Sequence, residues 1–308
     1  MPKIVQHPEI LIQARRGGTV ESLHRACAAL AGPDGEIVER WGDPSMVTFW
    51  RSSAKPLQAQ AWLADGTVEH WGWGAEQLAI MSASHDGLDV QAEVVKGMLS
   101  DLGLSEADLR CDHKLKAAHN CSGNHTGMLA ACVYHGWDVA SYQRADHPAQ
   151  VAGIESVAEA TGIAAVDMPC GVDGCGIVVY ATPITAMARG YARLPSLAPL
   201  IAAAMLAHPV FIEGEGEEDT VIMQAFPGVI SKGGAEGLCC AALPDGWGMA
   251  VKAVDGASRA PGLGLIALLV RHLSLLDVPE IARRRSRPPV LDSAGDVVGE
   301  LVVSLPGD

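Results

Sequence analysis

VTFWRSSAKPLQAQAWL, residues 47–63, is the stretch on which the fold prediction depends. Its beginning, up to Trp50, reads as a strand, and its end, from Leu57, continues as an apolar helix. Ser52 and Lys55 stand at the junction, three residues apart, and residues at this spacing share one face of a helix. The pattern is the S-x-x-K motif of acyl-transfer enzymes, in which a lysine takes the proton of a serine as the serine attacks.

A structural role accounts for the same residues. Ser52 or Ser53 could cap the helix, with Lys55 in solvent. The position of Ser52 between a strand and a helix favours catalysis, because active-site groups often lie at the ends of such elements. A lysine that acts as a base must first lose its own proton, and burial or cationic neighbours favour that loss.

Composition predicts a compact enzyme and excludes several classes of protein. The chain has 308 residues, of which 49% are hydrophobic and 19% charged, so it can bury a large core. Its formal net charge of −14 argues against nucleic-acid and anionic-membrane partners. We expect a cytoplasmic protein, because no secretory signal or membrane-spanning run is seen. The eight cysteines lack a disulfide spacing and are expected to be free thiols.

Predicted strands lie near both ends of the chain, and predicted helices fill the middle. The strands are a hairpin over 18–30 and 36–42, a second hairpin over 235–243 and 248–253, and a last strand over 297–303. The helices are 55–64, 75–82, 90–102, 124–135, 148–161, 184–192, 196–207 and 261–275. This order predicts an α+β fold, in which one antiparallel sheet from both chain ends is flanked by helices. We expect residues 1–308 to form a single catalytic domain of two packed lobes, the helical lobe spanning roughly 55–207, with the site in the cleft between them.

Four further segments carry reactive side chains. Residues 81–87 (MSASHDG) could be only a turn, and residues 119–128 lead into a helix whose amide groups can hold an anion. Residues 169–176 form a glycine-rich loop with a carboxylate and two thiols. In residues 249–256, Lys252 stands among apolar neighbours and is expected to be either paired or lowered in pKa.

Three of these side chains have the chemistry of zinc ligands. Cys121, His125 and Cys175 offer soft donors, but no Cys-x-x-Cys pair joins the cysteines. Spacing alone therefore favours buried structural thiols.

Five ordered segments together resemble the asparaginase II family of rhizobial type. They are 51–56 (RSSAKP), 83–85 (ASH), 121–129 (CSGNHTGML), 173–175 (DGC) and 251–256 (VKAVDG). The resemblance extends from Gly18 to about Leu275. It implies hydrolysis of L-asparagine to L-aspartate and ammonia, a fold similar to serine β-lactamases and glutaminases, and a homodimer.

The resemblance also assigns roles to residues. Ser52 would be the nucleophile with Lys55 as its base, and Ser84 with Lys252 would form a second serine-lysine pair. Two lysines close together lower each other's pKa, which helps one of them to act as a base. The candidates for binding the ammonium and carboxylate groups of the substrate are Arg51, His85 and Asp173.

The chain departs from the family pattern at two positions. The family binds zinc through two cysteines, which match Cys121 and Cys175, and a lysine whose position is occupied here by Asn124. No cofactor is required for the expected chemistry, and zinc remains an optional ligand. The family also has a basic residue after Gly-x-Gly, where this chain has Glu217, and the reversed charge could change substrate preference or affinity.

Two other functions stay open from the sequence. A different serine amidohydrolase, glutaminase-like or β-lactamase-like, would use the same Ser52 and Lys55. A β-lactamase is expected to carry S-D-N and K-T-G motifs, and residues 231–234 (SKGG) match the second only in part. A non-catalytic protein that binds small amides would show binding without turnover.

Overall fold

The computed structural model describes residues 4–275 and 277–306, with only the backbone of Ala64. The chain divides into two compact units. The sheet unit comprises the described residues of Met1–Thr48, Pro183–Ala192 and Val221–Asp308, and the helical unit comprises Phe49–Thr182 and Arg193–Thr220. The sheet unit thus contains residues from both ends of the chain. That the two units act as one catalytic domain stays a prediction.

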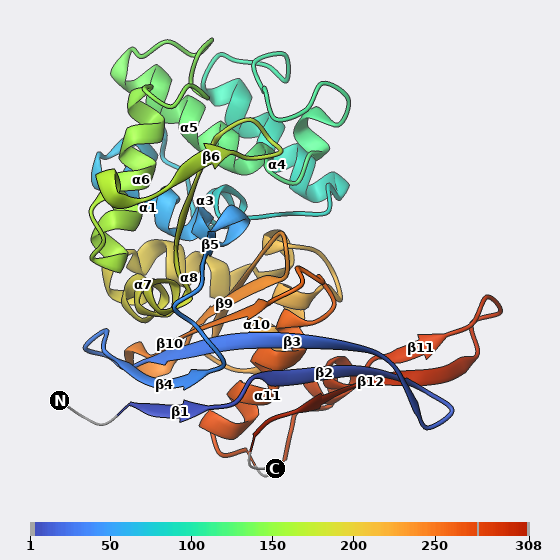
Figure 1. Ribbon diagram of the computed structural model, residues 1–308. Helices are drawn as coiled ribbons and strands as arrows, with labels where there is room; N and C mark the ends of the chain where they lie inside the picture. The colour runs from blue at the N-terminus through green and yellow to red at the C-terminus, as the bar shows by residue number, and fades with distance from the viewer. Residues whose placement is uncertain (1–3, 276, 307–308) are drawn as a thin grey trace. The chain divides into compact units, whose positions relative to one another are not determined.

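The sheet unit is built on a mainly antiparallel sheet (Figure 1). Among the described residues the sheet has nine strands, in the order β11-β12-β2-β3-β10-β9-β8, with β4 beside β3 and β1 parallel to β4. The strands are β1 (Val5–His7), β2 (Ile10–Arg16), β3 (Thr19–Ala31), β4 (Ile37–Trp41), β8 (Ile230–Gly234), β9 (Leu238–Ala242), β10 (Gly248–Ala253), β11 (Pro289–Leu291) and β12 (Val297–Ser304). Helices α11 (Pro261–His272) and α12 (Glu280–Ser286) also belong to it, with the single turn η4 (Pro244–Gly246).

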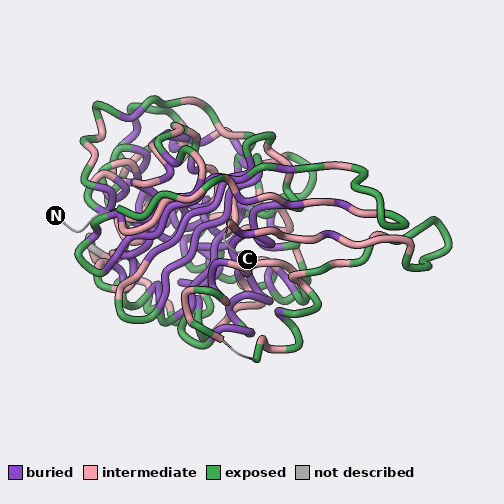
Figure 2. Tube along the Cα trace, turned by 60° about the horizontal axis from the view of Figure 1, so that its bottom comes forward, coloured by how far each residue is buried: buried purple, intermediate pink, exposed green. Residues whose placement is uncertain are grey.

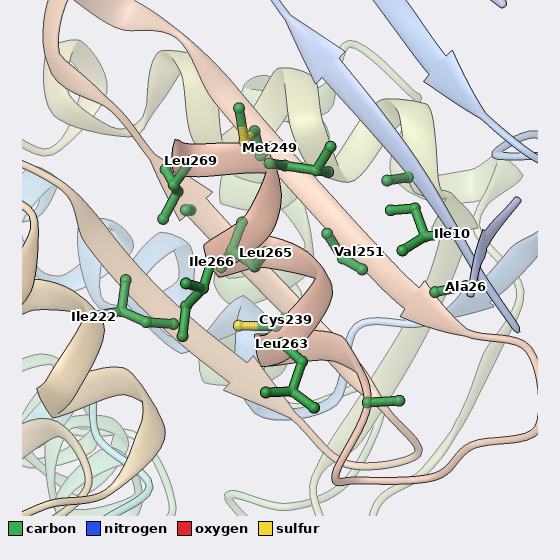
Figure 3. Packing of buried hydrophobic residues seen from close by; sticks show 14 of the residues in the cluster. Ile10, Ala26, Ile222, Cys239, Met249, Val251, Leu263, Leu265, Ile266 and Leu269 are labelled. Carbon is green, nitrogen blue, oxygen red and sulfur yellow. The ribbon is translucent and has the colours of Figure 1, made fainter. Parts of the chain in front are cut away.

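Side chains along the central strands point alternately to two buried faces of the sheet. Met249 and Val251 of β10 pack with Leu265 and Ile266 of α11 in one apolar cluster (Figure 3). Successive strand residues point to opposite faces, so Lys252 points away from α11. Figure 2 shows the middle of the sheet as buried and the tips of the hairpins as exposed. The sheet therefore buries Lys252 without placing it in the main apolar cluster.

The helical unit contains most of the predicted helices. Its elements are η1 (Arg51–Ala54), α1 (Lys55–Ala64), α2 (Thr67–Trp71), α3 (Ala75–Met81), α4 (Asp89–Asp101), η2 (Lys116–Ala118), α5 (Ser122–His135), α6 (Pro148–Thr161), η3 (Ala165–Asp167), β6 (Cys170–Val172), α8 (Pro199–Ala207) and α9 (Pro209–Ile212). Strands β5 (Val47–Phe49) and β7 (Val178–Pro183) and helices α7 (Ile184–Leu197) and α10 (Glu218–Ala225) contain the points where the chain passes from one unit to the other. Strands β5, β7 and β6 form a small sheet.

Several boundaries differ from the predicted ones, among them that of the helix predicted over 184–192, which extends to Leu197. Two of the differences have a clear local cause. The strand predicted from Ala235 begins at Leu238, because Glu236 and Gly237 have φ of 63° and 69° and form the turn that joins β8 to β9. The helix predicted from Ser196 begins at Pro199, since proline has no N–H group and suits a first helical position. Both corrections result from local backbone chemistry.

In residues 4–275 and 277–306, no single helix is both long and apolar enough to span a bilayer. The bent pair α7 and α8 meets the length and hydropathy criteria only when the two helices are counted together.

Helix α5 approaches its neighbours closely because it carries two glycines. A Cβ atom on Gly123 would lie 2.2 Å from the carbonyl oxygen of Ile80, and one on Gly127 would lie 2.7 Å from the ring of Trp62. These contacts leave no room for a side chain. The glycine in CSGNH therefore allows α5 to pack directly against the end of α3.

We predict that Gly123→Ala lowers the free energy of unfolding by about 2 kcal/mol or more, because the clash involves backbone atoms that cannot move away cheaply. Gly97 is the matched control: it is exposed in α4, and no atom would lie within 4 Å of its Cβ. Gly97→Ala should raise stability by about 1 kcal/mol. Urea unfolding of both variants measures these effects, and equal stabilities would contradict the packing argument.

Candidate active site

Buried hydrogen bonds to β7 fix the turn that carries Ser52. Trp50 is fully buried, and its main-chain N–H donates to the Tyr180 carbonyl at 3.0 Å. Its indole Nε1 donates to Thr182 Oγ1 at 2.9 Å. Arg51 then adopts a φ of 48°, in the left-handed region that residues other than glycine rarely enter. The strained turn leads directly into η1 and places Ser52, half buried, at the strand-to-helix junction.

Lys55 is the best-buried cationic group of the site, with a side chain only 2% exposed. Its Nζ lies 2.6 Å from the Ala83 carbonyl, 3.1 Å from Ser84 Oγ, 3.4 Å from the Asn120 carbonyl and 3.3 Å from Cys121 Sγ. These partners come from the loop after α3 and from the start of α5. Lys55 therefore joins three segments that lie far apart in the sequence.

The geometry of Lys55 differs from the sequence-based pairing. The sequence pairs Lys55 with Ser52, but within the described chain the hydroxyl that Lys55 contacts is that of Ser84. Ser52 and Lys55 nevertheless line the same small pocket, together with Arg51, Asp173 and Cys175 among others. The structure thus brings both candidate serines close to one lysine.

The end of α9 holds the loop that carries Ser84. The Ser84 N–H donates to the Ile212 carbonyl at 2.8 Å, and the Asp86 N–H donates to the Glu213 carbonyl at 2.7 Å. Gly214 follows, and a Cβ there would clash with Asp86 Oδ2. The start of the glutamate-rich segment, residues 213–218, therefore helps to hold the Ser84 loop in place. Glu217 lies in the turn before α10, where its N–H donates to the Gly214 carbonyl.

His85 uses both of its ring nitrogens inside the fold. The Gly87 N–H donates to Nδ1 at 3.1 Å, which assigns the ring proton to Nε2. Nε2 then donates to Ser122 Oγ at 2.9 Å, and that hydroxyl donates to the Ala117 carbonyl at 2.8 Å. The ring is 1% exposed, so it connects the Ser84 loop to α5.

Burial and then the nearby Lys55 lower the pKa of His85 from 6.5 to about 4. The unfolded chain therefore takes up this proton at a higher pH than the folded chain does. We predict that the free energy of unfolding falls as pH drops from about 6.5 to about 4, by up to about 3 kcal/mol from this residue. His85→Asn should make the fall shallower. Urea unfolding at about pH 7 and about pH 5 measures both slopes, and identical slopes would refute the assignment.

Arg51 and Asp173 form a two-pronged ion pair. Arg51 Nε donates to Asp173 Oδ2 at 2.9 Å, and a terminal guanidinium nitrogen donates to Oδ1 at 3.0 Å. The loop that carries Asp173 is held by Gln143, whose Nε2 donates to the Cys175 carbonyl at 2.7 Å. The pair is partly exposed and charged, as a site for a zwitterionic ligand requires.

Two thiols lie beside the lysine. Cys121 and Cys175 are both buried and hydrogen-bond to each other. The Cys175 thiol, and then the charge of Lys55, hold the pKa of Cys121 well below its ordinary value. The same hydrogen bond and burial raise the pKa of Cys175.

The residues at the expected zinc position do not fit that metal. Across the described ranges, no three His, Cys, Asp or Glu side chains are grouped to hold a metal ion. Asn124, at the position of the family lysine, is buried and donates its amide N–H to the Met81 carbonyl at 3.1 Å. Its oxygen is a poor ligand for zinc, which prefers nitrogen and sulfur in structural sites. The side chain of Lys55 already contacts Cys121 Sγ.

Lys252 belongs to the sheet unit. It is buried on β10, opposite Cys27 of β3, and its Nζ donates to the Ala253 carbonyl. Burial lowers its pKa from the ordinary value of 10.5. This agrees with the expectation for a lysine among apolar neighbours, while its pairing with Ser84 stays a prediction.

Several groups that complete the site were missed by the sequence analysis. They are the main-chain carbonyls of Ala83 and Asn120, the carbonyl of Ile212 and the amide of Gln143. Main-chain groups leave no signature in a residue pattern, so no sequence signal could have identified the first three. For Gln143, the sequence signal is Gly176: this glycine has a φ of 87° and forms a tight turn against the Gln143 side chain.

The sequence matches the family L-asparaginase II over residues 12–303. The chain therefore belongs to the L-asparaginase II family. A search of curated protein sequences finds no significant match.

The chain is similar to solved structures at low sequence identity. The crystal structure of Mglu in its native form is 15% identical, with a TM-score of 0.51, over 82% of this chain and 66% of that chain. A probable glutaminase from Bacillus subtilis, complexed with 6-diazo-5-oxo-L-norleucine, is 14% identical with a TM-score of 0.40, over 84% and 87% of the two chains. A β-lactamase from Mycobacterium bovis is 15% identical with a TM-score of 0.39, over 81% and 95%.

The chain spans just under two thirds of the length of Mglu. The predicted α+β class, similar to serine β-lactamases and glutaminases, is confirmed.

Proposed function

We propose that this protein is an L-asparaginase that converts L-asparagine and water to L-aspartate and ammonia through an acyl-enzyme. The observation that carries the proposal is the buried Lys55, whose Nζ contacts one candidate serine and lines a pocket with the other. Membership of the L-asparaginase II family supports the substrate. We further propose that the protein acts in the cytoplasm as a homodimer.

Lys55 is arranged to serve as a base in its neutral form. A neutral amine has two N–H groups and one lone pair, and the Ala83 and Asn120 carbonyls provide two acceptors for the N–H groups. The lone pair is then available to a serine hydroxyl. Such a lysine takes the proton of the nucleophile as the new bond forms.

In the proposed reaction, Ser52 Oγ attacks the side-chain carbonyl of asparagine and its proton passes to Lys55. Ser84, which hydrogen-bonds to Lys55, relays this proton to the departing amine. Ammonia leaves and an ester between Ser52 and the β-carboxyl group remains. Water then attacks the ester, Lys55 accepts its proton and returns it to Ser52 Oγ as the ester bond breaks, and aspartate is released. Main-chain N–H groups near Ser52 stabilise the oxyanion in both steps.

Arg51 and Asp173 suit the two charges at the other end of the substrate. The Arg51 guanidinium is a cation that suits a carboxylate, and the Asp173 carboxylate can accept a bond from the substrate ammonium. His85, whose nitrogens are both used inside the fold, then acts by holding the Ser84 loop.

Ammonia and aspartate release from L-asparagine, with L-glutamine in parallel, tests the proposed function. We expect kcat/KM for asparagine to exceed that for glutamine, with equal amounts of ammonia and aspartate released. Turnover of glutamine alone would overturn the asparagine assignment. Turnover of neither amide, by protein that is folded by circular dichroism, would overturn the enzymatic proposal.

We predict that Asp173→Asn raises KM for asparagine by about 10-fold or more, because a charged hydrogen bond contributes about 1.5–3 kcal/mol. The effect on kcat should be smaller, since Asp173 contacts a part of the substrate that does not react. Asp146→Asn removes a well-exposed carboxylate from its pair with Arg144 and is the control. Unchanged KM in Asp173→Asn would remove Asp173 from the binding site.

A further inference from the structure

We propose that Cys121 is a positioning residue for Lys55 in this chain, and that the pair works without zinc. The inference rests on the proposed function of Lys55 as a base. It assigns to Cys121 a task that its resemblance to a family metal ligand does not predict. The thiol would fix the position of the lysine instead of holding a metal ion.

Lys55 is held in place by contacts from several groups. Its Nζ contacts four groups, of which two are main-chain carbonyls and one is the Ser84 hydroxyl. The fourth is Cys121 Sγ at 3.3 Å, the only partner whose removal by mutation leaves the backbone and the candidate serines in place. The sulfur therefore limits the movement of Nζ on one side.

Main-chain hydrogen bonds hold Cys121 in place. Its N–H donates to His119 Nδ1 at 3.1 Å, and its carbonyl accepts a bond from the His125 N–H at 3.0 Å. The residue immediately precedes α5, and Gly123 allows this helix to pack directly against Ile80. The thiol is thus attached to a helix start that cannot shift easily, as the support of a catalytic group requires.

The residues around Cys121 are poorly suited to bind zinc. Two thiols need further nitrogen or sulfur ligands to form a structural zinc site. Asn124 supplies a neutral amide, whose N–H group donates to the Met81 carbonyl and whose buried oxygen, without a hydrogen-bond partner in the described chain, is a poor zinc ligand. The contact between Lys55 and Cys121 Sγ occupies a coordination direction of the sulfur and places the lysine amine beside it. With Asn124 in place of the family lysine, Cys121 therefore contacts Lys55 and does not bind a metal ion.

The first experiment measures asparagine kinetics in Cys121→Ala and Cys121→Ser. Cys121→Ala should lower kcat by about 10–100-fold with little change in KM, because a misplaced base slows chemistry more than binding. Cys121→Ser keeps a polar atom near Nζ and should recover most of the loss. Cys132→Ala, which removes a fully buried thiol from the same helix, is the control for packing damage. Wild-type kcat in Cys121→Ala would overturn the proposal.

The second experiment measures zinc content by mass spectrometry after growth with added zinc. The wild type should hold far less than one zinc per chain, and chelator should leave its kcat unchanged. Asn124→Lys supplies the missing amine and should take up zinc, which Asn124→Lys with Cys175→Ser should lose again. Stoichiometric zinc in the wild type that disappears in Cys121→Ser would overturn the proposal, and so would a folded Asn124→Lys variant without zinc.

Labelling by a fluorophosphonate separates this inference from the proposed substrate. The reagent reports an activated serine regardless of the amide that is hydrolysed. Slower labelling of Cys121→Ala than of the wild type, in protein that does not turn over asparagine, would overturn the substrate and support the role of Cys121. Equal labelling rates would overturn the role of Cys121 even if asparagine is the substrate.

Discussion

Replacing Lys55 with methionine is expected to lower kcat for L-asparagine by about 10³-fold or more. General-base catalysis contributes about 10²–10⁴-fold, and here the base also activates the nucleophile. Methionine has a similar length and fills the same buried space, so the variant should remain folded. It lacks the amine that contacts Ser84 and lines a pocket with Ser52. Steady-state kinetics and thermal unfolding of the same preparations measure the two properties separately.

Lys232 gives the matched comparison for this variant. It is also a buried lysine, on β8 of the sheet unit, and it stands in the SKGG sequence that partly matches the K-T-G motif. A β-lactamase-like mechanism predicts a large loss in Lys232→Met, whereas the asparaginase proposal predicts a loss only in Lys55→Met. A Lys55→Met variant with wild-type kcat would exclude Lys55 as the base.

Replacing Ser52 with alanine is expected to reduce kcat by about 10⁴-fold or more, because removing the nucleophile of an acyl-transfer enzyme leaves only binding and oxyanion stabilisation. Ser84→Ala should have a smaller effect, since it removes a proton relay and leaves the nucleophile in place. Lys55 contacts Ser84 directly, so the variants also test which serine is acylated.

The comparison must include substrate binding. Ser52→Ala should still bind asparagine, which isothermal titration can measure, because Arg51 and Asp173 are unchanged. If Ser84→Ala loses more activity than Ser52→Ala, the roles of the two serines are exchanged. In that case the hydrogen bond between Lys55 and Ser84 is the catalytic pair.

Periodic patterns made the helices predictable. The helix predicted over 55–64 has the same bounds as α1, and the one predicted over 148–161 has the same bounds as α6. Both begin with proline in the first turn, which is a strong local signal. The hairpin of β3 and β4 was also predicted, because the turn Gly32-Pro33-Asp34-Gly35 separates its strands.

Strands whose partners are distant in the sequence were harder to predict. Strand β2 was missed, although it lies between β3 and β12 in the sheet, because its pairing with β12 joins residues near opposite chain ends. Strand β8 was missed for a related reason: it is a short edge strand whose sequence, ISKGG, includes two glycines. Neither strand has a pattern long enough to identify it alone.

The candidate site was predictable in its side chains and unpredictable in its contacts. The S-x-x-K spacing identified Ser52 and Lys55, and the motif around Cys121 identified the start of α5. The direct contact of Lys55 with Ser84 depends on the loop after α3, which the carbonyl of Ile212 holds in place. That loop is positioned by residues more than a hundred positions away, so its geometry comes from tertiary packing.

Rapid-quench trapping of the acyl-enzyme tests the central claim most directly. Wild-type protein is mixed with L-asparagine, quenched in acid before the steady state, digested and mapped by mass spectrometry. The account predicts a β-aspartyl group on the peptide that contains Ser52, and its absence in both Ser52→Ala and Lys55→Met. An active enzyme that carries the adduct on Ser84, or on neither serine, would contradict the account.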